Sequence, residues 1–408
     1  MRFHWLVWAL LVMCIAVPAL AQEKRVTTTY DVVFEAALIP TERVVRATIR
    51  LGRGASAVRW IQLSIDPERH LDFNGDGEIE ESEGHIRWTP PRGGGELHYT
   101  FRIDHLRNQA AYDARCAEQW ALFRGGDLFP PARVRAKKGA ESISVLKFRM
   151  PKRWSSAVPY RRLSEGAYQI LNPTRLFDRP TGWMLVGRLG ILRERIAGSH
   201  VAVAGPIGQG VRRQDMLAFL RWTLPALRDA TGPLPDRLLI VSAGDPMWRG
   251  GLSGPRSAFL HAERPLITTD ATSPLLHELV HTQMGARAGE DGDWIVEGLA
   301  ELYSLEILVR SRSISRRRFR GSLSRLADRG SAAPRLRTAH ADPVITARAV
   351  GVLHRLDEAI RDATEHEASL DDVVTELMRT RGPVTTESFR EAIRIVAGRD
   401  LLGAIAER

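Results

Sequence analysis

The chain has 408 residues, of which 44% are hydrophobic, and its 58 basic and 48 acidic side chains give a formal net charge of +10. A chain of this length can bury more than one hydrophobic core, and its sequence contains no internal repeat or low-complexity tract. It has only 2 cysteines. A disulfide-stabilised scaffold is therefore excluded, and packed cores must hold the fold together.

Residues 1–21 have the pattern of a secretory signal peptide. A basic start precedes an apolar run from Trp5 to Val17, and a final Ala-Leu-Ala predicts cleavage after Ala21. The run is too short for a transmembrane helix, and no later stretch reaches the roughly 18 apolar residues that a span needs. We expect secretion across the inner membrane into the periplasm or the extracellular space. Because Cys14 lies in the signal, Cys116 would be the one cysteine of the mature chain.

Residues 22–205 are predicted to form an N-terminal antiparallel β-sandwich-like domain. Apolar and polar residues alternate with a period of two in the segments 25–35, 43–51, 58–65 and 96–103. This alternation is typical of half-buried strands, and the Gly and Pro clusters between the segments predict turns. We expect the domain to be a scaffold that shapes the entrance to a cleft.

Segment 72–83 matches an EF-hand-like calcium loop inserted in that domain. Oxygen-bearing side chains occupy loop positions 1, 3, 5, 9 and 12, with Gly77 at position 6 and Ile79 at position 8. The flanks are predicted strands rather than paired helices, so we expect one structural Ca²⁺, with a solvated acidic turn as the alternative. The predicted ligands, which include the backbone carbonyl of Glu78 and both carboxylate oxygens of Glu83, are Asp72, Asn74, Asp76, Glu78, Glu80 and Glu83.

The next part of the chain mixes helix and strand signals. Residues 213–230 carry apolar side chains at helical spacing and contain Pro225, which predicts a helix with a kink. Short strands are predicted at 237–242 and 264–269, on either side of a Gly-rich segment at 250–254. From its composition alone, that segment is either an edge strand or a flexible loop.

A helix that begins after Ser273 carries the central motif of the sequence. Ser273 suits the N-cap position, and Pro274 suits the first helical position. His277 and His281 are four residues apart and therefore lie on the same helix face, where both imidazoles can bind one metal ion. Glu278 follows the first histidine, as in the H-E-x-x-H arrangement of zinc peptidases, in which the glutamate is the general base.

A second helix is predicted from Asp293 and supplies two more carboxylates. Glu297 lies one turn into this helix and is the candidate third zinc ligand. Glu301, one turn further on, can accept a hydrogen bond from the free ring N–H of a zinc-binding histidine. Three ligands leave a fourth position for water, which indicates a catalytic zinc ion rather than a closed structural site. The alternative is a pair of half-buried core histidines.

The two motifs resemble the gluzincin metallopeptidases, and within them the M61 glycyl aminopeptidase-like group and its M1 aminopeptidase relatives. The similarity extends to Gly-Gly-Leu-Ser-Gly-Pro-Arg-Ser at 250–257 and Ala-Ser-Leu-Asp-Asp-Val-Val at 368–374, and covers about residues 205–400. It implies a thermolysin-like α/β catalytic domain over 206–310. It also implies peptide-bond hydrolysis by zinc-activated water, with Glu278 as general base and zinc on His277, His281 and Glu297.

The resemblance also implies an edge strand beside the zinc helix that binds an extended peptide by strand addition. The substrate-binding residues would be Gly250, Gly251, Leu252 and Ser253. At the position where the family has an acidic residue for the substrate's amine this chain has Ser253, and Gly254 replaces the histidine that follows. No tyrosine follows Tyr303. Support for the oxyanion would then come from zinc or from Arg348, His340 or His354. These departures leave a catalytically inactive M61-like zinc- and calcium-binding envelope protein as the alternative function.

Residues 311–408 are predicted to form a C-terminal helical region, with amphipathic helices at 344–362 and 370–404. Arginines crowd the segment 310–325, either as a solvated face or as a surface for anionic envelope components or acidic peptides. Nucleic-acid binding is disfavoured because the signal peptide directs the chain out of the cytoplasm and no aromatic-basic binding motif accompanies the arginines. A peptide or protein substrate is the expected partner.

Overall fold

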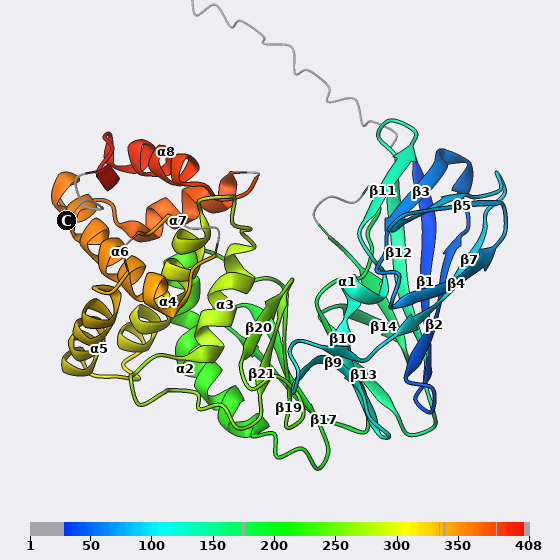
Figure 1. The fold of residues 1–408 in the computed structure, drawn as a ribbon, viewed down its shortest axis with the longest axis horizontal. Helices are drawn as coiled ribbons and strands as arrows, with labels where there is room; N and C mark the ends of the chain where they lie inside the picture. Colours follow the sequence, from blue (N-terminus) through cyan, green and yellow to red (C-terminus); the bar gives the residue numbers. More distant parts are fainter. Residues whose placement is uncertain (1–27, 173–175, 334, 338–339, 381, 404–408) are drawn as a thin grey trace, which may run out of the picture.

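The computed structural model describes residues 28–172, 176–333, 335–337, 340–380 and 382–403. The predicted signal peptide, 1–21, lies outside this part of the chain. The structure has a β-rich N-terminal part and a helical C-terminal part, with a mixed sheet between them (Figure 1). Of the helices described, none is both long enough and apolar enough to span a membrane.

Three sheets form the N-terminal part. The strand order of the first is β14 (Arg161–Ser164), β15 (Ala167–Ile170), β12 (Glu141–Arg149), β1 (Thr29–Ile39), β2 (Val44–Leu51), β7 (Gly95–Arg102) and β4 (His70–Gly75). The second contains β11 (Ala132–Ala136), β3 (Val58–Ser64), β6 (His85–Thr89) and β5 (Glu78–Ser82). The third contains β13 (Ser155–Ala157), β16 (Trp183–Gly187), β10 (Trp120–Arg124), β9 (Tyr112–Cys116) and β8 (His105–Leu106), and the short helix α1 (Gly125–Leu128) follows β10.

Strand β1 shows why the period-two pattern predicted these sheets. Tyr30, Val32 and Phe34 are fully buried, whereas the residues between them are only half-buried. The N-terminal domain is not purely antiparallel, however, because β1 pairs in parallel with β12. The distance in sequence between these strands explains the error, since residue alternation within a strand carries no information on its partner's direction.

The mixed sheet has the order β17 (Leu189–Ile196), β18 (Ser199–Pro206), β19 (Arg237–Ala243), β21 (Ser257–His261) and β20 (Gly251–Gly254). Its first two strands span residues 189–206, before most of the region 206–310 in which the catalytic domain was predicted. The Gly-rich segment is therefore an edge strand, β20, and not a flexible loop.

The strand predicted at 264–269 is wrong, because the segment folds into a loop. Thr268 closes it, donating its N–H to the Thr272 carbonyl and accepting a hydrogen bond on its hydroxyl from the Thr272 N–H. Pro265 has no N–H to donate to a sheet, which also disfavours a strand here.

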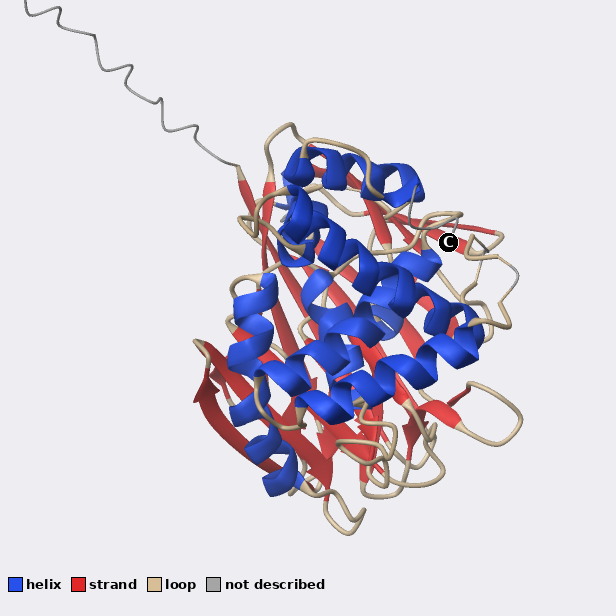
Figure 2. Ribbon diagram, turned by 90° about the vertical axis from the view of Figure 1, so that its left-hand side faces the viewer, coloured by secondary structure: helices blue, strands red, loops and turns tan. Residues whose placement is uncertain are grey.

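Helices pack against the face of the mixed sheet away from the N-terminal part (Figures 1 and 2). Pro225 lies inside the first of them, as predicted, and the segment 370–404 forms separate helices rather than a continuous one. The helices are α2 (Arg213–Thr231), α3 (Pro274–Met284), α4 (Asp293–Arg310), α5 (Arg316–Gly330), α6 (Pro343–Ala363), α7 (Leu370–Arg379) and α8 (Thr386–Ala397).

A hydrophobic core joins the two parts of the molecule. Leu122 and Trp183 from the third N-terminal sheet pack with Val241 and Phe259 from the mixed sheet, and all four are 0% exposed. Cys116 is a free, buried thiol at the end of β9. Burial, together with repulsion from Asp104, raises the pKa of the Cys116 thiol to about 12. It is therefore an unreactive core residue.

The calcium loop predicted at 72–83 is divided between two strands. Asp72 and Asn74 belong to β4, and Glu78 and Glu80 belong to β5, a strand of a different sheet. Asp76 and Glu83 lie just outside these strands. Glu80 instead pairs with Arg87 across to β6. Among the described residues, no three of the carboxylates of Asp72, Asp76, Glu78, Glu80 and Glu83 offer oxygens within 4.8 Å of one another.

Part of the arginine-rich segment pairs with other elements of the chain. Arg310 of α4 pairs with Asp371 of α7, Arg318 donates to the Thr268 carbonyl, and Arg325 pairs with Asp270. The last two contacts fix α5 against the loop before α3. Within the described chain no hydrogen bond or ion pair is formed by the side chains of Arg312, Arg316, Arg317 and Arg320, and these four remain the exposed basic surface that the sequence predicted.

Candidate active site

Helix α3 has the ends that the sequence predicted. The Ser273 hydroxyl accepts a hydrogen bond from the Leu276 N–H at 3.3 Å, and Pro274 is the first helical residue. The helix ends at Gly285, which adopts the left-handed conformation that favours glycine. The apolar side chains of the helix are buried, so it is held firmly: Leu275, Leu276, Leu279, Val280 and Met284.

Helices α3 and α4 bring the three predicted zinc ligands together. The His277 and His281 Nε2 atoms lie 3.1 Å apart. Glu297 places Oε2 3.3 Å from the His277 Nε2 and Oε1 3.4 Å from the His281 Nε2. In the described part of the chain, no other group of three His, Cys, Asp or Glu residues has ligand atoms all within 4.8 Å of one another.

These spacings fit a zinc ion. Tetrahedral ligands at about 2.1 Å from one ion lie roughly 3.4 Å from each other. The donor set of two imidazoles and one carboxylate is the one that catalytic zinc sites use, and it leaves a fourth position open. The three residues therefore have the geometry and the chemistry to hold Zn²⁺.

Glu301 orients His277 as predicted. Its Oε2 lies 3.0 Å from the His277 Nδ1, so the ring donates to the carboxylate and keeps Nε2 turned toward Glu297. A carboxylate in this position fixes the tautomer of a metal-binding histidine and increases its basicity.

Glu301→Gln is expected to weaken zinc binding by about 10–100-fold, because the neutral amide holds the His277 N–H less strongly. Zinc affinity measured by competition with a chromophoric chelator checks this. Glu81→Gln, at an exposed position of β5, is the control and should bind zinc like the wild type. Equal affinities in the two variants would contradict the role of Glu301.

The charges of the site are strongly coupled when no metal is bound. Burial by itself lowers the pKa of His277, but hydrogen bonds to Glu297 and Glu301 outweigh it and raise this pKa to about 10. Burial likewise raises the pKa of Glu297, but hydrogen bonds from His277 and His281 outweigh it and hold the pKa well below its usual range. The metal-free site therefore carries an internal ion pair at neutral pH.

Glu278 lies against the edge strand. Burial raises the pKa of its carboxyl group, while the nearby His277 and His281 oppose that rise. The Ser253 backbone N–H donates a hydrogen bond to the carboxylate. A higher pKa suits a general base, since such a group must both take a proton and give it back.

Strand β20 faces the zinc helix with its unpaired edge. The Gly250 carbonyl accepts a bond from the His261 N–H, so in an antiparallel ladder the backbone groups of Gly251 and Ser253 point away from β21. The sheet order leaves β20 without a second neighbour. A peptide can therefore add to this edge beside Glu278.

Gly251→Ala is expected to slow a reaction in which Glu278 is the base on the order of 100-fold, because displacing a catalytic group by about 1 Å costs that much. A Cβ here would lie 2.5 Å from the Glu278 Cγ and 2.9 Å from its Oε1, so Glu278 would have to move. Initial rates and zinc content check this together. Gly321→Ala, whose new Cβ would meet only the Arg325 Nη1 at 3.5 Å, should retain activity. A fully active Gly251→Ala would contradict the positioning.

Trp183 is a residue that the sequence analysis missed. Its indole N–H donates to the Leu252 carbonyl at 3.0 Å, and its backbone N–H donates to the Ser257 hydroxyl at 2.8 Å. The N-terminal part thereby fixes the edge strand of the mixed sheet beside Glu278. No local pattern around Trp183 indicates this contact, which joins residues 69 apart.

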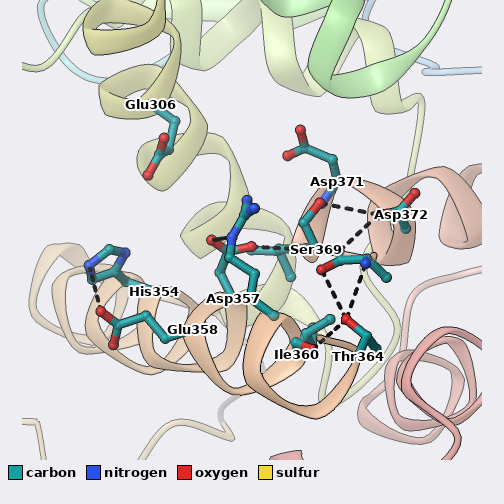
Figure 3. A network of polar contacts seen from close by, with 12 residues as sticks. Glu306, His354, Asp357, Glu358, Ile360, Thr364, Ser369, Asp371 and Asp372 are labelled. Atoms are coloured by element: carbon teal, nitrogen blue, oxygen red, sulfur yellow. Dashed lines mark hydrogen bonds and ion pairs between the residues drawn. The ribbon is translucent and has the colours of Figure 1, made fainter. Parts of the chain in front are cut away.

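The predicted oxyanion donors have other contacts. Figure 3 shows His354 turned toward Glu358 on the same helix, where the two side chains lie 4.0 Å apart. Arg348 donates to the Ala333 carbonyl after α5. His340 lies just before α6. Tyr303 is buried and donates to Asp371 at 2.7 Å, within the polar network that joins α4 and α7.

No known family profile matches the sequence, and no curated protein does. Solved structures match the fold. An aminopeptidase N family protein from Idiomarina loihiensis has a TM-score of 0.66 at 12% identity, over 88% of this chain and 72% of that one. An M1 zinc metallopeptidase mutant from Deinococcus radiodurans, bound to a Tyr-Ser-Ala substrate, has a TM-score of 0.63 at 16% identity, over 93% and 92% of the two chains.

The chain has the fold of the M1 zinc metallopeptidases. A further structure of the Deinococcus radiodurans M1 zinc metallopeptidase aligns over 90% of this chain and 89% of that one, with 18% identity and a TM-score of 0.60. The M1-like fold thus covers the N-terminal part, the mixed sheet and the helices together. The sequence predicted this relationship through its zinc motifs, whereas the structural likeness does not single out the M61 group.

Proposed function

We propose that this protein is a secreted zinc-dependent peptidase. One observation carries the proposal: three ligand atoms converge at the spacing of a tetrahedral zinc site, beside Glu278 and the unpaired edge of β20. A purely structural metal site has no need of a buried carboxylate at this place or of an adjoining free sheet edge. The fold shared with M1 zinc metallopeptidases supports the same function.

Each residue has a separate role in the hydrolysis. Bound zinc would lower the pKa of its water to near 7 and polarise the scissile carbonyl. Glu278 takes a proton from the attacking water and passes it to the leaving amine. Gly251 and Ser253 align the peptide backbone along β20, and Glu301 holds His277 in the tautomer that binds the metal.

The finer assignments rest on the sequence. The motifs at 250–257 and 368–374 place the chain near the M61 group, and the leader at 1–21 directs it out of the cytoplasm. This chain has Ser253 at the position where the family has an acidic residue, so it lacks the group that would bind a free substrate amine. We therefore propose an endopeptidase, or a peptidase for blocked N-termini, rather than an aminopeptidase.

Metal content by mass spectrometry and cleavage of a quenched-peptide library test the proposal. We expect one zinc ion per chain and cleavage of peptides with blocked N-termini. One zinc ion without cleavage of any peptide would favour the inactive zinc-binding envelope protein. Absence of zinc would overturn the zinc-dependent function altogether.

A further inference from the structure

A cleft of about 890 Å³ opens beside the predicted zinc site. His281 and Ser253 line it, together with the turn after β20 and the segment after α3. This volume is within the range of sites that enclose ligands of a few residues. A peptide that adds to β20 would therefore continue into this cleft.

Two arginines give the cleft a positive charge. Arg256 and Arg287 both line it, and within the described chain neither has a carboxylate partner. Asp236 also lines the cleft, but its side chain is 79% exposed and lies 3.6 Å from Arg237. The arginine charges are thus uncompensated within the cleft.

Arg256 is held firmly in place. Its guanidinium donates to the Leu171 carbonyl at 2.9 Å and to the Asn172 Oδ1 at 2.7 Å, and it stacks over the Tyr160 ring at 4.7 Å. Two of its five N–H groups are used in these bonds, so others stay free for a ligand. Its orientation is therefore set before any ligand arrives.

The backbone of Arg256 is strained. Its φ is 54° in the tight turn between β20 and β21, a conformation that glycine adopts without strain. Glycine would adopt this conformation at lower cost, and the arginine in its place supplies the bonds to Leu171 and Asn172. The contact with Asn172 and the free charge in the cleft are the two uses that the structure offers.

The direction of β20 sets which side of the substrate reaches these arginines. The strand runs from Gly251, beside Glu278, to Gly254, beside Arg256. A peptide that adds antiparallel to it runs the opposite way, so its residues near Arg256 precede the bond near Glu278. We propose, building on the peptidase function above, that the cleft selects substrates with an acidic side chain on the N-terminal side of the cleaved bond.

Ser253 is consistent with this preference. It has a hydroxyl group where a carboxylate would attract the ammonium of a free N-terminus, and the nearby charges of the cleft are positive. A substrate ammonium would be repelled by Arg256 and Arg287, whereas a carboxylate would form charge-assisted hydrogen bonds with them. The same two arginines thus favour acidic residues and disfavour free amines.

The test uses N-acetylated alanine hexapeptide amides with one Glu at successive positions, each paired with its Gln counterpart. Zinc-loaded wild type is expected to show about tenfold higher kcat/KM for the Glu peptide when Glu precedes the cleaved bond. Arg287→Gln should lower this Glu/Gln ratio toward one, and so should high salt. Arg287 is changed first because, among the described residues, its side chain forms no hydrogen bond or ion pair, whereas Arg256 bonds to Leu171 and Asn172 of the N-terminal part. Arg320→Gln on α5 is the matched control.

Binding of the same labelled peptides to zinc-loaded Glu278→Gln, measured by fluorescence anisotropy, separates the two proposals. Tighter binding of Glu peptides with no cleavage by wild type would support the acidic preference and overturn the peptidase. Cleavage with a Glu/Gln ratio of one at every position would support the peptidase and overturn the preference. If Arg287→Gln and Arg320→Gln both kept the full Glu/Gln preference, the proposal that the cleft selects acidic side chains would also be overturned.

Discussion

Glu278→Gln is expected to lower kcat/KM by about 10²–10⁴-fold while zinc stays bound. The amide cannot take a proton from the attacking water, yet its oxygen can still accept the hydrogen bond from the Ser253 N–H. Glu278 is also not one of the three predicted metal ligands, which are His277, His281 and Glu297. Activity is therefore lost without loss of the site.

Rates on a blocked peptide that the wild type cleaves, together with zinc content and the melting temperature, check this result. The exposed Glu81→Gln variant should match the wild type in all three measurements. If Glu278→Gln kept most of its activity with zinc bound, another group would have to be the base. Loss of zinc from this variant would show that Glu278 holds the metal site together instead of acting in the reaction.

Removal of zinc by a chelator is expected to abolish activity reversibly and to leave the chain folded. In the metal-free site, protonated His277 neutralises part of the charge of Glu297 and Glu301, to which it is hydrogen-bonded. Each of these two carboxylates therefore keeps a charged hydrogen-bond partner at neutral pH. Circular dichroism before and after chelation, and recovery of activity on adding zinc, check this. His281→Ala is the control that zinc should not reactivate, because it lacks a ligand.

The metal-free protein is further expected to lose stability as the pH rises above neutral. The pKa of His277 is raised from 6.5 to about 10 on folding. Its contribution to the free energy of unfolding is therefore complete below pH 6.5 and is lost as the pH rises through about 10. Urea unfolding of chelated His277→Gln, which has no such ionisation, should show a smaller decrease between pH 7 and 10. Identical decreases would contradict this coupling.

Local sequence signals predicted the zinc site because its components are local. The spacing of His277 and His281 places both on one helix face, and Ser273 and Gly285 begin and end that helix as single residues with known preferences. Glu297 and Glu301 follow the same periodicity on α4. These local signals could not predict that α3 and α4 lie side by side. The resemblance to known peptidases predicted that packing.

The calcium loop shows how a local pattern can mislead. Spacing of oxygen atoms from Asp72 to Glu83 matched a calcium-binding loop, but the backbone there pairs into β4 and β5. Pairing with β6 and β7 satisfies the backbone there, and it divides the predicted ligands between two sheets. The parallel partner of β1 was missed for a related reason.

By itself, the sequence predicted the shared site of His277, His281 and Glu297 beside Glu278, and most of the helices, because helical periodicity and capping depend on residues within a few positions of one another. Only the tertiary structure decided that β20 is an edge strand, that Trp183 holds it from the other part of the molecule, and that Arg256 and Arg287 share a cleft with His281. These arrangements depend on packing between segments far apart in the chain, which no local spacing of residues records.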